Sequence, residues 1–262
     1  MHRYTLEDYA VLAHNILNSE TQHLSNKGII SELFNDTPIN DFESIVKNRI
    51  TIIDSYYSTQ MSKRLYGIDE LAKAISDYSD VALKTETAKF LNSPSEDNII
   101  STLFLKEYGI DKSGKPFGKA ISLISKYIYF LNDGNFPIYD SLAIDSYKLL
   151  KKNGLIGIKT AINENNYFAY IKDLNSATNI NDYEKLDNLL WLLGKLSKGS
   201  FSILMNKSKY ESLIKGLSVK LKSVKSKQKD NLIRQHIEGI YQTSDLFSDN
   251  QKTFFEFVFR LK

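Results

Sequence analysis

The chain has 262 residues, of which 42% are hydrophobic and 25% charged, and it carries a formal net charge of +3 at pH 7. These proportions are typical of a globular protein with a substantial core. The absence of cysteine excludes disulfides, cysteine-ligated zinc and iron–sulfur clusters, and only four histidines are present, so we expect no metal site and no other cofactor.

The sequence predicts neither a membrane span nor a secretion signal. It has no run of about 18 apolar residues. The first ten residues, MHRYTLEDYA, lack the charged, apolar and small-residue segments of a secretion signal. We therefore expect a cytoplasmic protein that does not enter the membrane.

Helical patterns dominate the chain. Only four prolines occur, and Leu, Ile, Lys, Glu and Ser fill long segments, which predicts an all-α fold. The first helix is expected to begin at Thr5, with Asp8 completing a capping box. Further helices are predicted over 41–61, with or without a break, and over 96–108, where Pro and acidic residues mark the first turn.

A short basic segment, IDKSGKPFG at 110–118, follows the helix predicted over 96–108. Its glycines and proline predict a tight turn into the next helix, so that the two helices form a hairpin. Free amides at the start of the second helix, together with Lys112 and Lys115, would then face a phosphate. The alternative is an ordinary helical hairpin that binds nothing.

The stretch 117–141 carries the strongest candidate for chemistry. Lys119 and Lys126 are seven residues apart and would share one face of a helix. Pro137 stiffens the approach to Asp140. The stretch would thus hold an amine and a carboxylate on either side of one reacting group. The alternatives are that Asp140 only caps a helix and that Lys119 contacts solvent or phosphate.

The composition changes near Lys195. From Lys195 to Arg234 the chain has eleven Lys or Arg residues against two acids, Glu211 and Asp230. We therefore divide the chain into a body over 1–195 and a basic helical extension over 196–262. Lys222 and Lys225 lie on one basic stripe and are candidate DNA contacts, the alternative being a solvated face.

Two segments leave their secondary structure open. Leu155–Ile158 is either a short β-rich piece or the approach to a helix. The apolar end, TFFEFVFRLK at 253–262, either docks against the body or forms a terminal strand.

Three motifs in order resemble the helix-hairpin-helix superfamily of DNA glycosylases, which contains endonuclease III and the 8-oxoguanine glycosylases. They are Ser58-Thr59-Gln60, Gly118-Lys119-Ala120 and Phe136-Pro137-Ile138-Tyr139-Asp140. SKYIYFLNDGNFPIYDS at 125–141 and LDNLLWLLGK at 186–195 also resemble uncharacterised bacterial proteins of this superfamily. The resemblance covers roughly 45–195, and Ser-Gly-Lys-Pro-Phe-Gly stands where the family has Leu-Pro-Gly-Val-Gly.

The resemblance implies a role for each matching residue. Asp140 would be the carboxylate that stabilises positive charge on the sugar, and Lys119, with Lys126 as the competing amine, would attack the sugar carbon. Gln60 would fill the space left by an extruded base, and Gly118 belongs to the hairpin that holds DNA phosphates. Candidate residues of the base pocket are Tyr57 and Tyr139.

The sequence thus predicts a two-lobed glycosylase-like helical body that acts on double-stranded DNA as a monomer. Its reaction would be excision of a damaged or modified base, with or without abasic-site lyase activity. The base would lie in the cell's own genome, as in DNA repair, or in invading DNA, as in phage defence. The alternative is a non-catalytic helical DNA-binding or interaction module on the same scaffold.

Overall fold

A computed structural model describes residues 4–19, 23–35, 41–93, 97–157, 168, 175, 180 and 182–261. Within these residues every regular element is a helix, and β-structure is limited to isolated bridges. The prediction of an all-α fold is therefore confirmed. No helix in these ranges has the length and apolar character that crossing a membrane requires.

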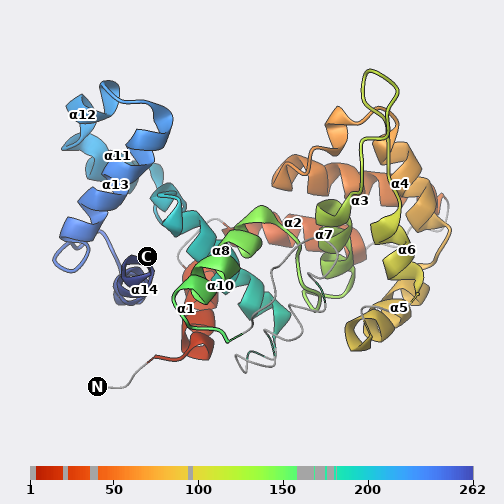
Figure 1. Cartoon of the computed structure of the whole chain (residues 1–262), viewed down its shortest axis with the longest axis horizontal. Coiled ribbons are helices and arrows are strands. Elements are labelled where there is room, and N and C mark those ends of the chain that lie inside the picture. Colours follow the sequence, from red (N-terminus) through yellow and green to blue (C-terminus); the bar gives the residue numbers. More distant parts are fainter. Residues whose placement is uncertain are drawn as a thin grey trace. The chain divides into compact units, whose positions relative to one another are not determined.

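The chain forms two compact units (Figure 1). Unit 1 combines Met1–Leu24, Ser141–Lys159 and Asn175–Lys262, and unit 2 combines Ser25–Asp140 and Thr160–Leu174. The division predicted at Lys195 stays a prediction. In the structure, the helices that follow Lys195 lie in the same unit as the first helix of the chain.

Unit 1 is built on the packing of a long apolar helix against the N-terminal helix. Its elements are α1 (Leu6–Ser19), α8 (Ser141–Lys152), α10 (Tyr183–Ser197), η2 (Phe201–Leu204), α11 (Lys207–Lys215), α12 (Ser218–Lys222), α13 (Ser226–Ile240) and α14 (Asp249–Arg260). The predicted capping box of α1 is confirmed, since the Thr5 amide donates to Asp8 at 2.7 Å and the Asp8 amide to the Thr5 hydroxyl at 3.2 Å. Helix α10 packs against both α1 and α8.

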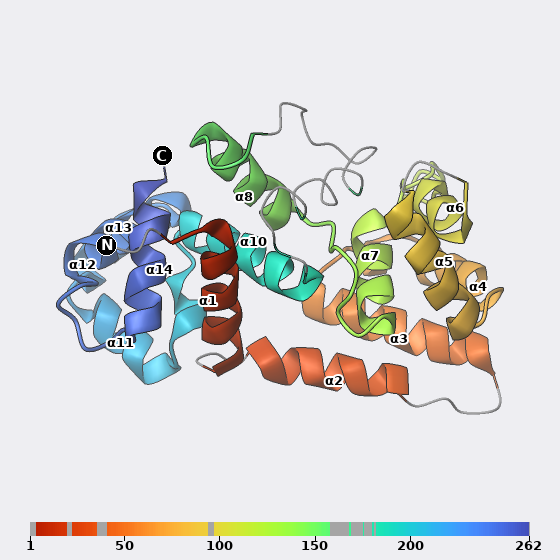
Figure 2. The same cartoon turned by 90° about the horizontal axis from the view of Figure 1, so that it is seen from below.

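The C-terminal segment is the helix α14, not a strand. It lies beside α1, where the rings of Tyr9 and Phe257 stack with centroids 4.0 Å apart (Figure 2). Phe254, Phe255 and Val258 are fully buried. The docking alternative is therefore the correct one. Leu155 to Gly157 belong to neither helix nor strand, and Ile158 lies outside the described residues.

Unit 2 surrounds one buried helix, α7 (Ile121–Leu131), in which every residue except Ser122 is buried. The others are α2 (His23–Asn35, which belongs to this unit from Ser25 on), α3 (Phe42–Tyr57), η1 (Met61–Lys63), α4 (Gly67–Ser76), α5 (Asp80–Asn92) and α6 (Ile99–Leu105). Of the two alternatives for 41–61, helix α3 shows the one without a break near residue 49, but it ends at Tyr57 and not at Met61. The start predicted for α6 falls on 94–96, outside the described residues, and Asn98 caps the helix instead.

The connection between α6 and α7 corrects the prediction of a tight turn. Residues 106–120 form an antiparallel ribbon, with bridges between Glu107 and Lys119 and between Ile110 and Pro116. Asp111 closes its tip by accepting the amides of Ser113 at 2.7 Å and Lys115 at 3.1 Å. Figure 1 shows this ribbon projecting from the helices of unit 2. The difference arises because the Asp111 side chain bonds nearby backbone amides, and such bonds favour a turn over a helix.

The base of the ribbon needs glycine at one position. Gly109 has φ +73°, and a Cβ there would lie 2.8 Å from Arg64 Cβ and 2.9 Å from Gly67 Cα. Gly114 at the tip also has a positive φ, of +81°, but a Cβ there would meet nothing within 4 Å. An alanine at Gly114 would therefore suffer backbone strain alone, whereas an alanine at Gly109 would suffer backbone strain and a steric clash.

We expect Gly109→Ala to destabilise the protein more than Gly114→Ala does. Both changes cost about 1–2 kcal/mol because an L-residue resists the left-handed conformation. Gly109→Ala adds a clash with backbone, which costs roughly 1–3 kcal/mol more. Urea denaturation followed by circular dichroism gives the two free energies of unfolding. Equal losses would contradict the close packing described at Gly109.

Candidate functional site

A polar stripe runs along one face of the buried helix α7. Ser122, Ser125 and Lys126 are spaced i, i+3 and i+4, which places them on adjoining turns of one face. Lys126 is only 2% exposed. Its Nζ donates to the Ser122 hydroxyl at 2.9 Å and to the Ser122 carbonyl at 3.4 Å. The same nitrogen lies 5.4 Å from the centroid of the Tyr57 ring. The amine thus lies at a small polar site on the surface of an otherwise apolar helix.

The segment that ends at Asp140 is attached to this stripe. The Tyr139 amide donates to the Ser125 hydroxyl at 3.0 Å, and that hydroxyl donates to the Ser122 carbonyl at 3.1 Å. Asp140 directly follows Tyr139 and Lys126 directly follows Ser125. The hydrogen bond between Tyr139 and Ser125 therefore brings the backbones of Asp140 and Lys126 near each other. Asp140 is partly exposed and directly precedes α8.

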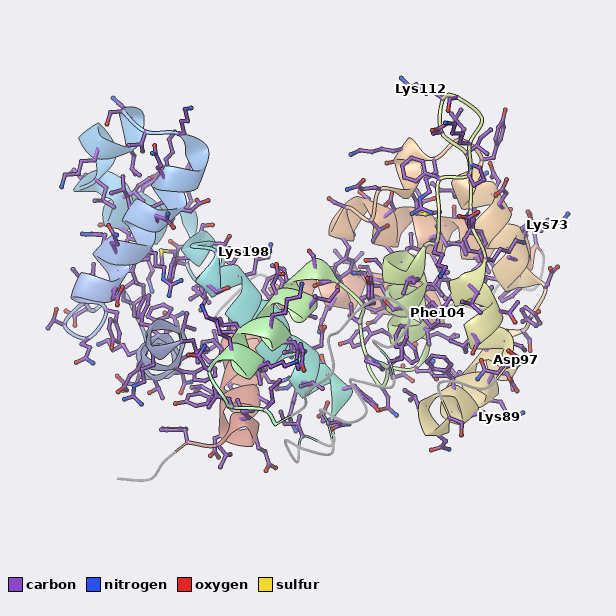
Figure 3. All side chains as sticks on the ribbon, in the orientation of Figure 1. Lys73, Lys89, Asp97, Phe104, Lys112 and Lys198 are labelled. Atoms are coloured by element: carbon purple, nitrogen blue, oxygen red, sulfur yellow. The ribbon has the colours of Figure 1, made fainter. Side chains whose placement is uncertain are left out.

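An aromatic cluster fixes the other end of that segment. Phe136 is fully buried and packs against three rings, with centroids 5.5 Å from Phe168, 6.0 Å from Phe90 and 6.3 Å from Phe104. Figure 3 marks Phe104 within unit 2. The residues from Phe136 to Asp140 are therefore held at both ends, which gives Asp140 a defined backbone position.

Gln60 lies on a tight turn that a buried carboxylate organises. Asp54 accepts the Thr59 hydroxyl at 2.6 Å and the amides of Met61 and Ser62 at 2.9 Å each. Burial by itself raises the pKa of Asp54, but these hydrogen bonds outweigh it and hold the pKa below its ordinary value. Gln60 is exposed.

Two non-glycine residues of this turn adopt left-handed backbone conformations. Ser58 has φ +51° and Gln60 has φ +67°. Such conformations are costly and persist only where the surrounding structure over-determines them, as at many binding sites. The hydrogen bonds to Asp54 therefore define the backbone conformation that presents Gln60 at the surface.

Lys119 does not lie on α7, which corrects the prediction that it shares a helix face with Lys126. The helix begins at Ile121, and Lys119 pairs with Glu107 in the ribbon. Arg64 fixes this geometry, because its guanidinium donates to the carbonyls of Gly118 at 2.7 Å and Lys119 at 3.0 Å. A residue committed to extended pairing cannot also begin the helix.

The remaining predicted residues lie apart from the stripe on α7. Lys112 and Lys115 are exposed at the tip of the ribbon, where Figure 3 marks Lys112, and Gly118 is in its returning strand with φ +106°. Lys222 and Lys225 are exposed residues of unit 1, at the end of α12 and the start of α13. The structure thus gathers Lys126, Tyr57 and the Tyr139–Asp140 segment around α7.

Sequence reasoning missed the residues that do the positioning: Ser122, Ser125, Asp54 and Arg64. Polar residues at i, i+3 and i+4 in an otherwise apolar helix were a usable signal for the first two. Among the described residues no three His, Cys, Asp or Glu side chains gather closely enough to hold a metal ion. Comparison of the chain with protein-family models, curated protein sequences and solved structures gives no match.

Proposed function

We propose that the protein is a DNA glycosylase, which cleaves the N-glycosidic bond of a damaged or modified base in double-stranded DNA. One observation supports this proposal most directly. The hydrogen bond from the Tyr139 amide to the Ser125 hydroxyl attaches the segment that ends at Asp140 to the turn of α7 that carries Lys126. A carboxylate can stabilise the charge on the sugar during base excision, and an amine on adjoining backbone can serve as the nucleophile in place of water.

Asp140 would act on the charge that develops in the reaction. As the bond between the base and the deoxyribose C1′ breaks, its electrons leave with the base and positive charge builds on the sugar. A carboxylate already held beside the sugar stabilises this charge without reorganisation. It can also orient the attacking water and accept its proton.

For a lysine mechanism the surroundings favour Lys126 over Lys119. Lys126 is 2% exposed and its amine contacts the Ser122 hydroxyl and the face of Tyr57. An amine in desolvated surroundings is a strong nucleophile, and binding of DNA would have to uncover Lys126 before its amine attacks C1′ while the base departs. Loss of a proton from the nitrogen and opening of the sugar ring then give a Schiff base. Loss of a proton from C2′ then expels the 3′ phosphate and so breaks the strand.

The other residues receive binding roles in this proposal. Gln60, on its rigid exposed turn, would enter the space that an extruded base leaves in the duplex. Tyr57 and Tyr139 would line the pocket that receives the base. The protein would work as a monomer in the cytoplasm. Its target would be either a lesion in the cell's own genome or a modified base in phage DNA.

Excision is tested by incubating the full chain with duplexes that each carry one oxidised, alkylated or phage-type base, followed by hot alkali. We expect strand breaks at one class of base, which also separates repair from defence. No break with any base would contradict the proposal. Binding without excision would instead favour the non-catalytic module.

Borohydride trapping separates the two amines. We expect a covalent complex with the wild-type protein, its loss in Lys126→Gln and its retention in Lys119→Gln. Circular dichroism checks that each variant is folded, because Lys126 is buried. Trapping that survives in Lys126→Gln but disappears in Lys119→Gln would assign the nucleophile to the ribbon. Excision without trapping in the wild-type protein would mean that water is the nucleophile.

A further inference from the structure

The ribbon over 106–120 and the strand-like segment beside it form a surface that the glycosylase chemistry does not use. The amide of Leu65 donates to the Ile110 carbonyl at 3.0 Å, and the amide of Ile110 donates back at 3.1 Å. Ile110 also bridges to Pro116, so three short stretches of backbone lie side by side. The chain reaches Leu65 from Gln60 through the short helix η1, so the Gln60 turn directly precedes the stretch that pairs with the ribbon.

This surface carries exposed apolar side chains. Tyr66 is 66% exposed, Leu65 47% and Phe117 36%. The Arg64 guanidinium covers one face of Phe117 at 4.8 Å, which leaves Tyr66 as the ring with the most free area. Tyr66 also has a left-handed backbone with φ +64°, so its position is fixed by the bridge at Leu65 and by the start of α4.

Basic residues outnumber acidic ones on the segments that carry these rings. Over 60–70 and 106–119 there are six basic residues against four acidic ones: Lys63, Arg64, Lys106, Lys112, Lys115 and Lys119 against Asp69, Glu70, Glu107 and Asp111. Three of the four acids have partners, since Asp69 pairs with Lys47, Glu70 accepts the Gly109 amide, and Asp111 accepts the hydrogen bonds that close the tip. Lysines around an exposed ring match a polymer that has phosphates beside flat bases.

We propose that this surface is a DNA-binding arm, in which Lys112 and Lys115 contact phosphates and the Tyr66 ring stacks on an unpaired base other than the one that the pocket of Tyr57 and Tyr139 would receive. The arm requires that the polymer be DNA, and in this respect it rests on the proposed function. It does not require Asp140 or any bond cleavage. It extends the contact from the Gln60 turn along the ribbon.

The rigidity of the arm strengthens the inference. Arg64 donates to the carbonyls of Tyr108 and Gly118 on opposite strands of the ribbon, at 3.3 Å and 2.7 Å. The amide of Gly109 donates to the Glu70 carboxylate of α4 at 2.7 Å. A ribbon braced at its base loses little backbone freedom on binding, so the remaining cost is that of ordering the lysine side chains.

Binding by the full chain is measured by fluorescence anisotropy on two labelled duplexes, one fully paired and one with a single unpaired base. We expect Lys112→Ala/Lys115→Ala to weaken binding to both and to reduce the slope of log affinity against log salt by about 1.8. The matched control is Lys73→Ala/Lys89→Ala, which removes the same charge from exposed positions on α4 and α5. Figure 3 marks these two lysines away from the tip.

The Tyr66 variants test stacking separately from charge. Tyr66→Asn removes the ring but suits the left-handed backbone. We expect it to weaken binding to the duplex with the unpaired base by about fivefold to a hundredfold, with the salt slope unchanged. Tyr66→Phe keeps the ring and should bind as the wild type does. A smaller effect on the fully paired duplex is expected, because its bases are stacked.

Three results would overturn the arm. They are no binding of the wild-type protein to either duplex, equal binding by the two double-lysine variants, and unchanged binding of Tyr66→Asn to the duplex with the unpaired base. The proposed function fails independently. If the arm variants lose binding but the wild-type protein excises no base, the arm stands without the glycosylase. If bases are excised and the arm variants bind normally, only the arm is wrong.

Discussion

Asp140→Asn should lower the rate of base excision by about a hundredfold to a thousandfold, the usual cost of removing one preplaced electrostatic group. The amide has nearly the same shape but no charge to oppose the positive charge on the sugar. Single-turnover excision on the duplex found in the base panel measures the rate of the chemical step. Binding to the same duplex is measured in parallel, so that a defect in chemistry is separated from a defect in affinity.

Asp133→Asn is the matched control for this experiment. Asp133 lies on the same connection between α7 and α8, and its side chain is 84% exposed. Its φ of +52° also suits asparagine. We expect the control to excise as the wild type does. An Asp140→Asn variant that keeps full activity would remove Asp140 from the mechanism and leave it a role at the start of α8.

Arg49→Ala should cause the largest loss of stability, about 3–5 kcal/mol, because it leaves a buried charge network without its cation. Arg49 is 1% exposed. It donates to both oxygens of Asp80, at 2.9 and 3.1 Å, and to the Leu33 carbonyl at 3.0 Å. It also donates to the Tyr127 hydroxyl at 3.3 Å, and so joins α2, α3 and α5 to α7.

Thermal and urea denaturation of the full chain give the loss in the free energy of unfolding. Lys47→Ala is the control. Lys47 lies on α3, as Arg49 does, and pairs with Asp69 of α4 at an exposed position, where ion pairs contribute little. A loss in Arg49→Ala no greater than in the control would show that the network contributes nothing net. Burial raises the pKa of Tyr127 to about 12, so its hydroxyl keeps its proton throughout this test.

The fold class and several local signals could be predicted from the sequence because they depend on neighbours in the chain. The capping box of Thr5 and Asp8 and the helical spacing of apolar residues are examples. The ribbon could not be predicted in this way. Its pairing of Ile110 with Leu65, and the clamp that Arg64 places on it, join residues far apart in sequence, and no periodicity reports such contacts.

The candidate site likewise contains residues that the sequence predicts and one residue that it places wrongly. A motif predicts Asp140, the spacing from Lys119 predicts Lys126, and Tyr57 is a candidate aromatic residue of the base pocket; the structure places Lys126 and Tyr57 in contact. Lys119 was placed on a helix because its spacing from Lys126 fits one, yet extended pairing with Glu107 takes it out of that helix. Spacing predicts a shared face only where both residues belong to one helix, and the sequence did not locate that boundary.

The bracing of the ribbon at its base affects how the protein can change over evolution. Arg64, Glu70 and Gly109 hold the base through backbone groups, whereas Lys112 to Lys115 are exposed at the tip. Substitutions or insertions at the tip are therefore expected to leave the contacts at the base of the ribbon in place. Descendants of one such chain can acquire different charge and length there, and so different preferences among partners, without altering the helix that carries Lys126.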